Sequence, residues 1–284
     1  MSKTGLVLEG GGLRGVFTAG VIDCFLDKEI DFDYCIGVSA GSCNTFSYVG
    51  KQRGYVRSCM IQKDPANAFW GVRQMVESHK FVDLDKIFYE YTEQYGFDFD
   101  EFIKNKMPWE MVVSNMATGK AEYMHTDDIE RSRLIGKASC SMPGLTSPVE
   151  IDGQLYLDGG ICDSIPVQRA LDQGCEKLVI VLTRKKGNYS RVNEAAMTIF
   201  RRIYGDYPNF LDALAARTQL YHDQVDLSEK LEEEGKAIII RPTFKEVSRL
   251  ESKEDELLMA YYHGYTKTKE YSDKIIEFLK KQDE

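Results

Sequence analysis

The sequence predicts an α/β fold in three layers, α/β/α, with a mostly parallel central sheet and a helical C-terminal extension. Over residues 5–185, short apolar runs alternate with amphipathic stretches. This is the order in which parallel strands and their covering helices follow one another. Residues 186–284 show mainly long helical periodicities. We therefore expect a core over 5–185 and a mostly helical C-terminal part that packs on it, with Gly187-Asn188 as the boundary.

The first elements of the chain follow this alternation. Leu6–Glu9 is a short apolar run, and Arg14–Leu26 repeats apolar residues at the spacing of one helix face. A second apolar run over Tyr34–Val38 predicts the next strand, and Ser42–Val49 is compatible with a helix that follows it. Each strand thus has the crossover helix that parallel pairing needs.

The middle of the chain predicts a helix over Asp83–Tyr95. Two strands follow, Glu110–Met116 and Lys120–His125, and a turn at Ala117–Gly119 joins them. We expect Thr126 to cap a further helix that runs to about Ala138, because acidic residues follow it in the first turn. Tyr156–Asp158 reads as another short strand.

The last third predicts two more strands and two helical segments. The strands are Lys177–Thr183 and Lys236–Arg241, and the helical segments are Arg191–Glu234, broken near Gly205 and Pro208, and Lys253–Lys281.

Bulk composition excludes several classes of protein. No apolar run approaches the ~20 residues that a membrane-spanning helix needs, and no signal peptide precedes the first strand. The seven cysteines show no Cys-x-x-Cys spacing, so we expect buried reduced thiols, a cytoplasmic location and no metal site. A net charge of −9 argues against nucleic acid as a partner and gives no help in approaching an anionic membrane. It leaves open a transient contact with a membrane surface, and the oligomeric state is not predicted.

A serine motif follows the second predicted strand. Gly37-Val38-Ser39-Ala40-Gly41 has the form of a nucleophile elbow, in which a serine on a tight strand-to-helix turn needs small residues two positions away on either side. The predicted helix after it would direct its positive dipole end toward Ser39. A serine in an ordinary strand-to-helix turn is the alternative, since a short pattern also arises by chance.

The glycine loop Gly10-Gly11-Gly12-Leu13-Arg14-Gly15 allows two interpretations. Its Gly-x-Gly-x-x-Gly spacing fits a dinucleotide site, which also needs an acidic residue after the second strand; Asp31 and Asp33 lie before that strand. The other interpretation is an oxyanion loop, in which consecutive glycines let backbone N–H groups approach developing negative charge.

Ser39 needs a base, and the candidates are a histidine or a carboxylate. His222 and His263 both lie in apolar helical patterns rather than in loops, where triad histidines usually lie. Asp158 ends a short strand and is followed by Gly159-Gly160, which would let the backbone turn and keep the carboxylate reachable.

These motifs together resemble the patatin-like phospholipase family, in its bacterial branch. The resemblance covers about residues 5 to 171. It is carried by the glycine loop with Arg14 and Gly15, by the elbow Gly37–Gly41, by Asp158-Gly159-Gly160, by Lys137–Pro143 and by Pro148-Val149 and Ile165–Val167.

The resemblance implies a serine–aspartate dyad that cleaves lipid or small acyl esters without a cofactor. Ser39 would be the nucleophile, Asp158 the general base, and the N–H groups of Gly10 to Gly12 and Ala40 the oxyanion hole. A histidine-triad esterase, a nucleotide-binding protein that uses Gly10–Gly15 and a non-catalytic interaction protein remain alternatives. The aromatic-rich stretch Phe81–Phe102 fits helix packing or an acyl pocket, and two basic clusters, Arg184–Lys186 and Arg201-Arg202, fit solvated loop ends or membrane docking.

Overall fold

The computed structural model describes residues 2–62, 64, 67–79, 81–187, 194–244, 246–251 and 253–280. Asn188 of the predicted boundary, the predicted helix start at Arg191 and the predicted helix end at Lys281 lie outside these residues.

One mixed sheet runs through the molecule in the order β5-β6-β3-β2-β1-β7-β8, with β4 paired to β3. Its parallel centre joins β3, β2, β1, β7 and β8, whereas β4, β5 and β6 run antiparallel. The strands are β1 (Thr4–Leu8), β2 (Tyr34–Val38), β3 (Trp109–Asn115), β4 (Lys120–Met124), β5 (Val149–Ile151), β6 (Gln154–Asp158), β7 (Lys177–Val181) and β8 (Ala237–Ile240). The predicted α/β class with a mostly parallel sheet is confirmed.

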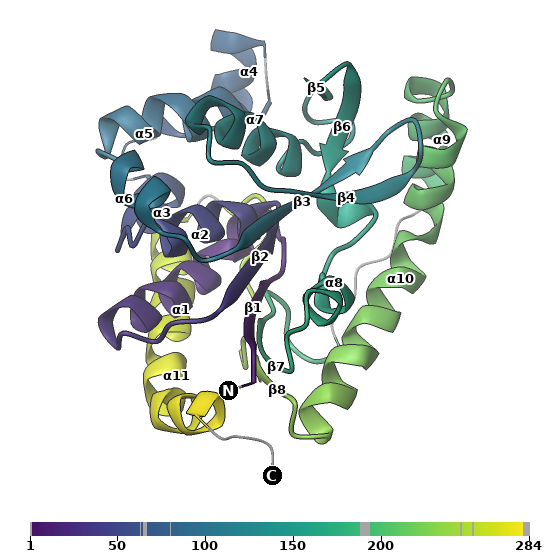
Figure 1. Ribbon diagram of the computed structural model, residues 1–284. Coiled ribbons are helices and arrows are strands. Elements are labelled where there is room, and N and C mark those ends of the chain that lie inside the picture. The colour runs from purple at the N-terminus through teal and green to yellow at the C-terminus, as the bar shows by residue number, and fades with distance from the viewer. Residues whose placement is uncertain are drawn as a thin grey trace.

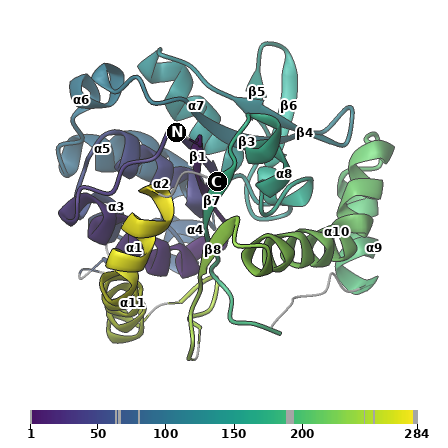
Figure 2. The same cartoon turned by 60° about the horizontal axis from the view of Figure 1, so that its bottom comes forward.

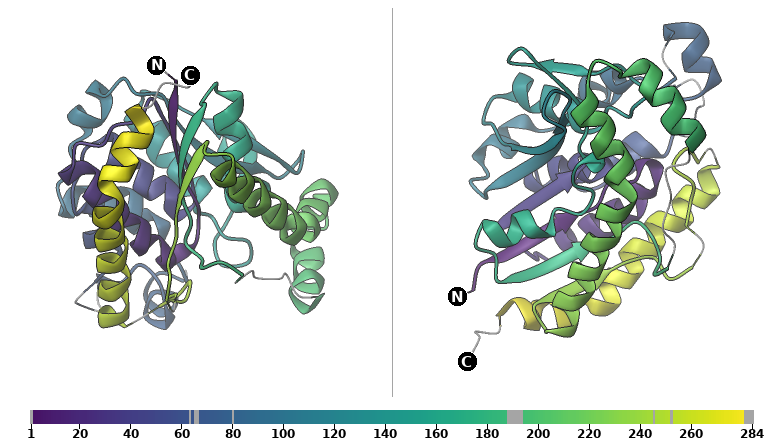
Figure 3. Two further views of the ribbon diagram at one scale, coloured as in Figure 1. Left: turned by 90° about the horizontal axis from the view of Figure 1, so that it is seen from below. Right: turned by 90° about the vertical axis from the view of Figure 1, so that its right-hand side faces the viewer.

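Helices cover both faces of this sheet (Figures 1 and 3). One face carries α1 (Gly15–Asp27), α2 (Ala40–Val49) and α11 (Glu254–Lys280), and the other carries α8 (Val167–Asp172) and α10 (Pro208–Glu233). The alternation of β1 explains the two layers, because its successive side chains point to opposite faces. Leu6 and Leu8 join the core beneath α1 and α11, and Val7 joins the core beneath α8 and α10.

The remaining helical elements are shorter than α1, α10 and α11. They are η1 (Gly12–Arg14), α3 (Tyr55–Met60), α4 (Val72–Ser78), η3 (Lys86–Glu90), α5 (Tyr91–Gln94), α6 (Phe99–Lys104), α7 (Ile129–Ser139), η4 (Gly159–Ile161) and α9 (Glu194–Ile203). Figure 2 shows α9 and α10 on the side of the molecule opposite α11. The predicted break near Gly205 and Pro208 separates α9 from α10.

One helix boundary differs from the prediction. Thr126 does not cap the helix that follows it; Asp128 is the N-cap of α7, and its side chain accepts a hydrogen bond from the Arg131 N–H. Thr126 instead accepts from the Asp128 N–H and shapes the preceding turn. The helix predicted over 83–95 is confirmed, since residues 84–94 are continuously helical, with a π-helical turn at Lys86–Glu90 that leads into α5.

The C-terminal part is joined to the rest of the fold through the sheet. Its strand β8 pairs in parallel with β7, and α11 packs along α1. No helix in the described part of the chain combines the length and the apolar content that crossing a membrane requires.

Candidate active site

Ser39 lies at the carboxyl end of β2 in a strained turn. Its backbone has φ 55° and ψ −122°, and α2 begins at the next residue. The turn is possible because its neighbours are glycines: a Cβ on Gly37 would lie 2.4 Å from the Gly41 carbonyl oxygen, and one on Gly41 would lie 2.3 Å from that of Leu8. The local geometry is therefore that of a nucleophile elbow, with the serine raised above the strand end.

A buried serine from another helix fixes the elbow. Ser139, near the end of α7, accepts a hydrogen bond from the Ser39 N–H at 2.9 Å and donates to the Val112 carbonyl at 2.6 Å. Its Oγ also lies 2.7 Å from Ser42 Oγ. These contacts tie β2, β3 and α7 together beneath Ser39.

The sheet register brings Asp158 to the same level as Ser39. Asp158 ends β6 and pairs with Val113, while the neighbouring Val112 pairs with Val38 of β2. A Cβ on Gly159 would lie 2.1 Å from the Val112 carbonyl oxygen. The glycine after the acid is therefore needed for this close approach.

The carboxylate of Asp158 is buried and hydrogen-bonded. Burial raises its pKa, and the hydrogen bond from the Ser39 hydroxyl is the strongest effect that opposes the increase. Arg217, the Gly160 N–H at 2.8 Å and Arg249 also lower the pKa. The acid therefore faces the serine and is a stronger base than an exposed aspartate.

The glycine loop lies beside the elbow. A Cβ on Gly10 would lie 3.0 Å from Ser39 Cβ, and Gly12 has φ 60°. No acceptor in the described part of the protein takes the N–H of Gly11, Gly12 or Ala40. The loop thus presents free donors next to the serine, as an oxyanion site needs.

The structure places the alternative residues elsewhere. His263 is packed between Phe17 and Phe244, and no histidine of the described chain lines the cavity that contains Ser39. Asp33 accepts hydrogen bonds from Thr4, at the opposite end of β1 from the glycine loop. Neither a triad histidine nor a ribose-binding acid accompanies the motifs.

Sequence reasoning missed several charged residues of this cavity. Arg184, Arg217, Arg249 and Glu9 line it together with Ser39 and Asp158. Arg184 is therefore neither a solvated loop end nor part of a docking surface, since only 6% of it is exposed. The available signal was in α10, where Arg217 falls on the apolar stripe of that helix.

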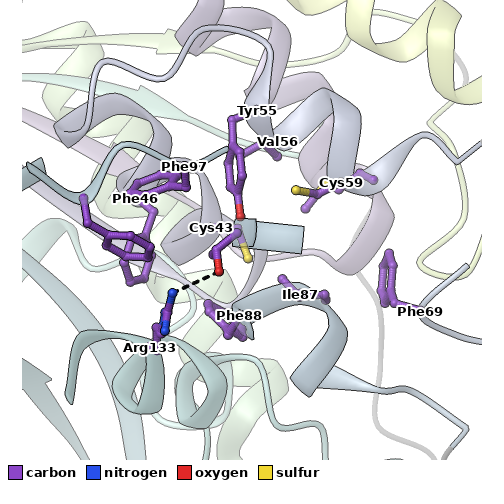
Figure 4. Close-up of a pocket in the computed structure, with 13 residues that line it drawn as sticks. Cys43, Phe46, Tyr55, Val56, Cys59, Phe69, Ile87, Phe88, Phe97 and Arg133 are labelled. Carbon is purple, nitrogen blue, oxygen red and sulfur yellow. Dashed lines mark hydrogen bonds between the residues drawn. The ribbon is translucent and has the colours of Figure 1, made fainter. Parts of the chain in front are cut away.

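An apolar slot leads from the cavity into the molecule. It starts at Ser39 and Ala40 and passes Cys43, Met60 and Ile87. The same three residues also line a deeper pocket whose walls carry rings from the aromatic stretch (Figure 4), namely Phe88, Phe97 and Phe99, with Phe46 beside them. The cavity, the slot and this inner pocket therefore form one path from the serine to a mostly apolar interior.

Comparison with known proteins gives matches to both halves of the chain. The model of the patatin-like phospholipase family matches residues 6–171, and that of a domain of unknown function, DUF6363, matches residues 207–280. The uncharacterized protein YjjU of Escherichia coli is 32% identical over 64% of this chain and 52% of its own length. Lysophospholipase NTE1 of Saccharomyces cerevisiae is 26% identical over 89% of this chain and 16% of its own length.

The chain thus spans about half of the first relative and about a sixth of the second. Among solved structures, VipD from Legionella pneumophila aligns with a TM-score of 0.57 at 14% identity, over 96% of this chain and 67% of that chain. At this identity the likeness concerns the fold alone.

Proposed function

Because this chain belongs to the patatin-like phospholipase family, we propose that it is a serine acyl hydrolase acting through a Ser39–Asp158 dyad. Family membership supports a lipid acyl hydrolase activity. The observation that carries the finer proposal is that Ser39 and the buried Asp158 carboxylate line one cavity, where the Ser39 hydroxyl lowers the pKa of that carboxyl, at the start of an apolar path.

The first half of the reaction transfers the acyl group to the protein. Ser39 Oγ attacks the ester carbonyl carbon while its proton passes to Asp158. The N–H groups of Gly11, Gly12 and Ala40 stabilise the negative charge that develops on the carbonyl oxygen. The bond to the alcohol then breaks, and the alcohol leaves with the proton held by Asp158.

The second half restores the enzyme. Asp158 takes a proton from a water molecule, whose oxygen attacks the acyl carbon. The ester bond to Ser39 breaks, Ser39 regains its proton, and the carboxylic acid is released.

The acyl chain of the substrate occupies the apolar slot and the inner pocket. Figure 4 shows Phe46, Phe88 and Phe97 around this space, with Arg133 at its edge donating to Thr92. Burying methylene groups there is favourable at ~0.8 kcal/mol each. A chain with its carbonyl at Ser39 therefore gains affinity as it lengthens along the path.

A fluorophosphonate probe tests the proposal. We expect it to label Ser39, identified by mass mapping, and the label to be absent in Ser39→Ala. Ser47→Ala is the matched control, because Ser47 is buried in the same helix and bonds the Gln52 carbonyl instead of facing the cavity. An unlabelled folded protein, under conditions that modify a known serine esterase, would contradict the proposal.

A further inference from the structure

Four arginines from distant parts of the sequence converge on the active-site cavity. Arg14 follows the glycine loop, Arg184 follows β7, Arg217 lies on α10, and Arg249 lies in the loop before α11. Two of them come from the C-terminal part of the chain. Arg217 and Arg249 lower the pKa of Asp158, but the proposed acyl transfer uses none of the four guanidinium groups as a proton donor or acceptor. The convergence of all four therefore needs a further explanation.

The carboxylates of the described cavity do not balance this charge. Only Glu9 and Asp158 face the four arginines there. Glu9 accepts hydrogen bonds from the Thr183 N–H and the Tyr221 hydroxyl, and Asp158 accepts from the Gly160 N–H and Ser39. Four guanidinium groups thus line the cavity with two carboxylates, and Glu246, which attracts Arg14 from outside the cavity, is a third. The arginines still outnumber the carboxylates around them.

The arginines of the cavity are buried or half-buried, and Arg217 Nε donates to the Gly160 carbonyl at 2.6 Å. Arg14 keeps one nitrogen without such an acceptor: only 8% of this residue is exposed, and its buried Nε has no hydrogen-bond partner. Burial, together with repulsion from the neighbouring arginines, lowers the pKa of Arg249 to about 9, and burial also lowers those of Arg14 and Arg217. All remain charged at pH 7. Buried charges without acceptors are costly, and an anion in the cavity would remove that cost.

Resting on the proposed function, we infer that the arginines bind a phosphate monoester on the alcohol side of the scissile ester. The apolar path leaves Ser39 through Cys43 and Met60, whereas Arg184 and Arg217 line the cavity and not that path. Arg249 lines both spaces and so lies where the cavity and the slot meet. The substrate class is therefore a singly acylated polyol phosphate, with its tail in the slot and its phosphate among the arginines.

The charge of the site favours a monoester over other headgroups. A phosphate monoester carries about −1.5 to −2 at pH 7, so it brings more negative charge to these arginines than a phosphodiester or a neutral headgroup does. A zwitterionic headgroup would bring a cation toward the arginines, and a neutral glycerol would leave them without an acceptor. Guanidinium groups bind phosphate oxygens in a bidentate manner, which adds geometric selectivity.

Hydrolysis of three esters with one acyl chain tests this inference. They are 1-acylglycerol 3-phosphate, 1-acylglycerol 3-phosphocholine and 1-acylglycerol, each presented in the same neutral detergent micelles. We expect kcat/KM to be at least about tenfold higher for the phosphate monoester, the size of one charged hydrogen bond. Arg249→Gln should lower that preference about tenfold, chiefly through KM, and Arg249→Lys should restore part of it.

A matched control removes one positive charge outside the cavity. Arg202 is exposed on α9 and does not line the cavity, so Arg202→Gln should keep the preference. Equal rates on the three esters, or a preference that Arg249→Gln leaves unchanged, would overturn the inference while the proposed function stands.

A binding measurement decides the inference independently of turnover. The ligands are two ether analogues, 1-O-alkylglycerol 3-phosphate and 1-O-alkylglycerol, and their binding to the Ser39→Ala variant is measured by calorimetry. We expect the phosphate to bind at least about tenfold more tightly than the neutral ether. The double variant Ser39→Ala/Arg249→Gln should lose this difference in affinity. Inorganic phosphate is the third titrant. Phosphate binding as tightly as the ether phosphate would assign the site to a free anion and overturn the lipid assignment. If no ester is hydrolysed, the proposed function fails, and the calorimetric comparison still supports or overturns the phosphate site.

Discussion

The basicity of Asp158 is the property of a single residue on which the proposed reaction depends. Burial raises its pKa, and the Ser39 hydroxyl, Arg217 and Arg249 hold the increase down. The net effect is a raised pKa, so the carboxylate is more basic than an exposed aspartate. Its hydrogen bond to Ser39 also places it where the proton must go.

Asp158→Asn should abolish ester hydrolysis while the protein still folds. An asparagine keeps the shape of the side chain and cannot accept the proton, so the loss should be at least ~100-fold, the low end of general-base catalysis. Initial rates on a chromogenic ester and circular dichroism check this. His222→Ala and His263→Ala should keep most activity. If a histidine variant were folded but inactive while Asp158→Asn remained active, that histidine and not Asp158 would be the general base.

Arg217→Gln should move the acid limb of the pH–rate profile to higher pH. Asp158 acts deprotonated, so the rate rises as pH passes through its pKa, and removing a nearby cation raises that pKa. The profile of kcat/KM on a neutral ester measures the shift, with Arg202→Gln as the control for charge. An acid limb that stays in place would mean that Arg217 does not act on the base.

Among the elements, the glycine loop depends most on residues that lack a side chain. Gly12 has a positive φ of 60°, and a Cβ on it would lie 2.7 Å from the Arg249 carbonyl oxygen. The same oxygen accepts a hydrogen bond from the Leu13 N–H at 3.0 Å. A side chain here would displace the loop and its donors.

Gly12→Ala should slow acylation of Ser39 by about 10²- to 10³-fold, as when one oxyanion donor is lost. Ester binding should change less, because these donors act mainly on charge of the transition state. Stopped-flow acylation measures the effect. Gly153→Ala is the matched control, since Gly153 also has a positive φ, 76°, and open space around it. If a folded Gly12→Ala variant is acylated at the rate of the parent protein, the loop is only a tight turn and does not act as an oxyanion site.

Asp163 links three elements below the site and sets a pH dependence of stability. It accepts hydrogen bonds from Tyr123 of β4 at 2.8 Å and Gln224 of α10 at 2.6 Å. Burial raises its pKa from 3.8 to about 6. The folded state therefore binds more protons than the unfolded state between these values, and this contribution to stability is lost as pH rises.

We compare the unfolding free energy of the wild type with that of Asp163→Asn. As pH rises from 4 to 7, the wild type should lose up to about 3 kcal/mol relative to the variant, because the pKa of Asp163 differs by about two units between the folded and unfolded states. Asparagine does not titrate, so the difference between the two proteins isolates this group. Urea unfolding at several pH values measures it. A difference that stays constant with pH would show that Asp163 is ionised throughout.

At the scale of the whole molecule, the sequence predicted what local patterns encode. Alternation of strands and helices predicted the layers, and glycine spacing predicted the turn around Ser39, because each follows from neighbours in the chain. The N-cap of α7 was misplaced by two residues, since Thr126 and Asp128 both have capping side chains and only the fold selects between them.

The composition of the cavity could not be predicted in this way. Arg217 and Arg249 reach Ser39 only after β8 has joined the sheet and α11 has packed on α1, and neither event leaves a local motif. The aromatic stretch similarly favoured helix packing and left an acyl pocket as the alternative. Phe88, Phe97 and Phe99 do both, because they pack on neighbouring rings and also line the inner pocket.

The C-terminal helix completes the molecule through an unusually close contact with α1. A Cβ on Gly264 would lie 2.0 Å from the Phe17 carbonyl oxygen, and one on Gly20 would lie 2.0 Å from that of Tyr261. The two backbones therefore meet at glycines. This contact also holds the end of the loop that carries Arg249, since α11 begins shortly after it.

Gly264→Ala should destabilise the protein by ~1–3 kcal/mol, the usual effect of overpacking a core. Helix propensity alone predicts the opposite sign, because alanine is favoured over glycine by ~1 kcal/mol inside a helix. The sign of the change in unfolding free energy, from urea titration, therefore separates the two effects. Lys269→Ala, at an exposed position of the same helix, should change stability by less than ~0.5 kcal/mol. A more stable Gly264→Ala would show that α11 does not pack against the α1 backbone at this residue.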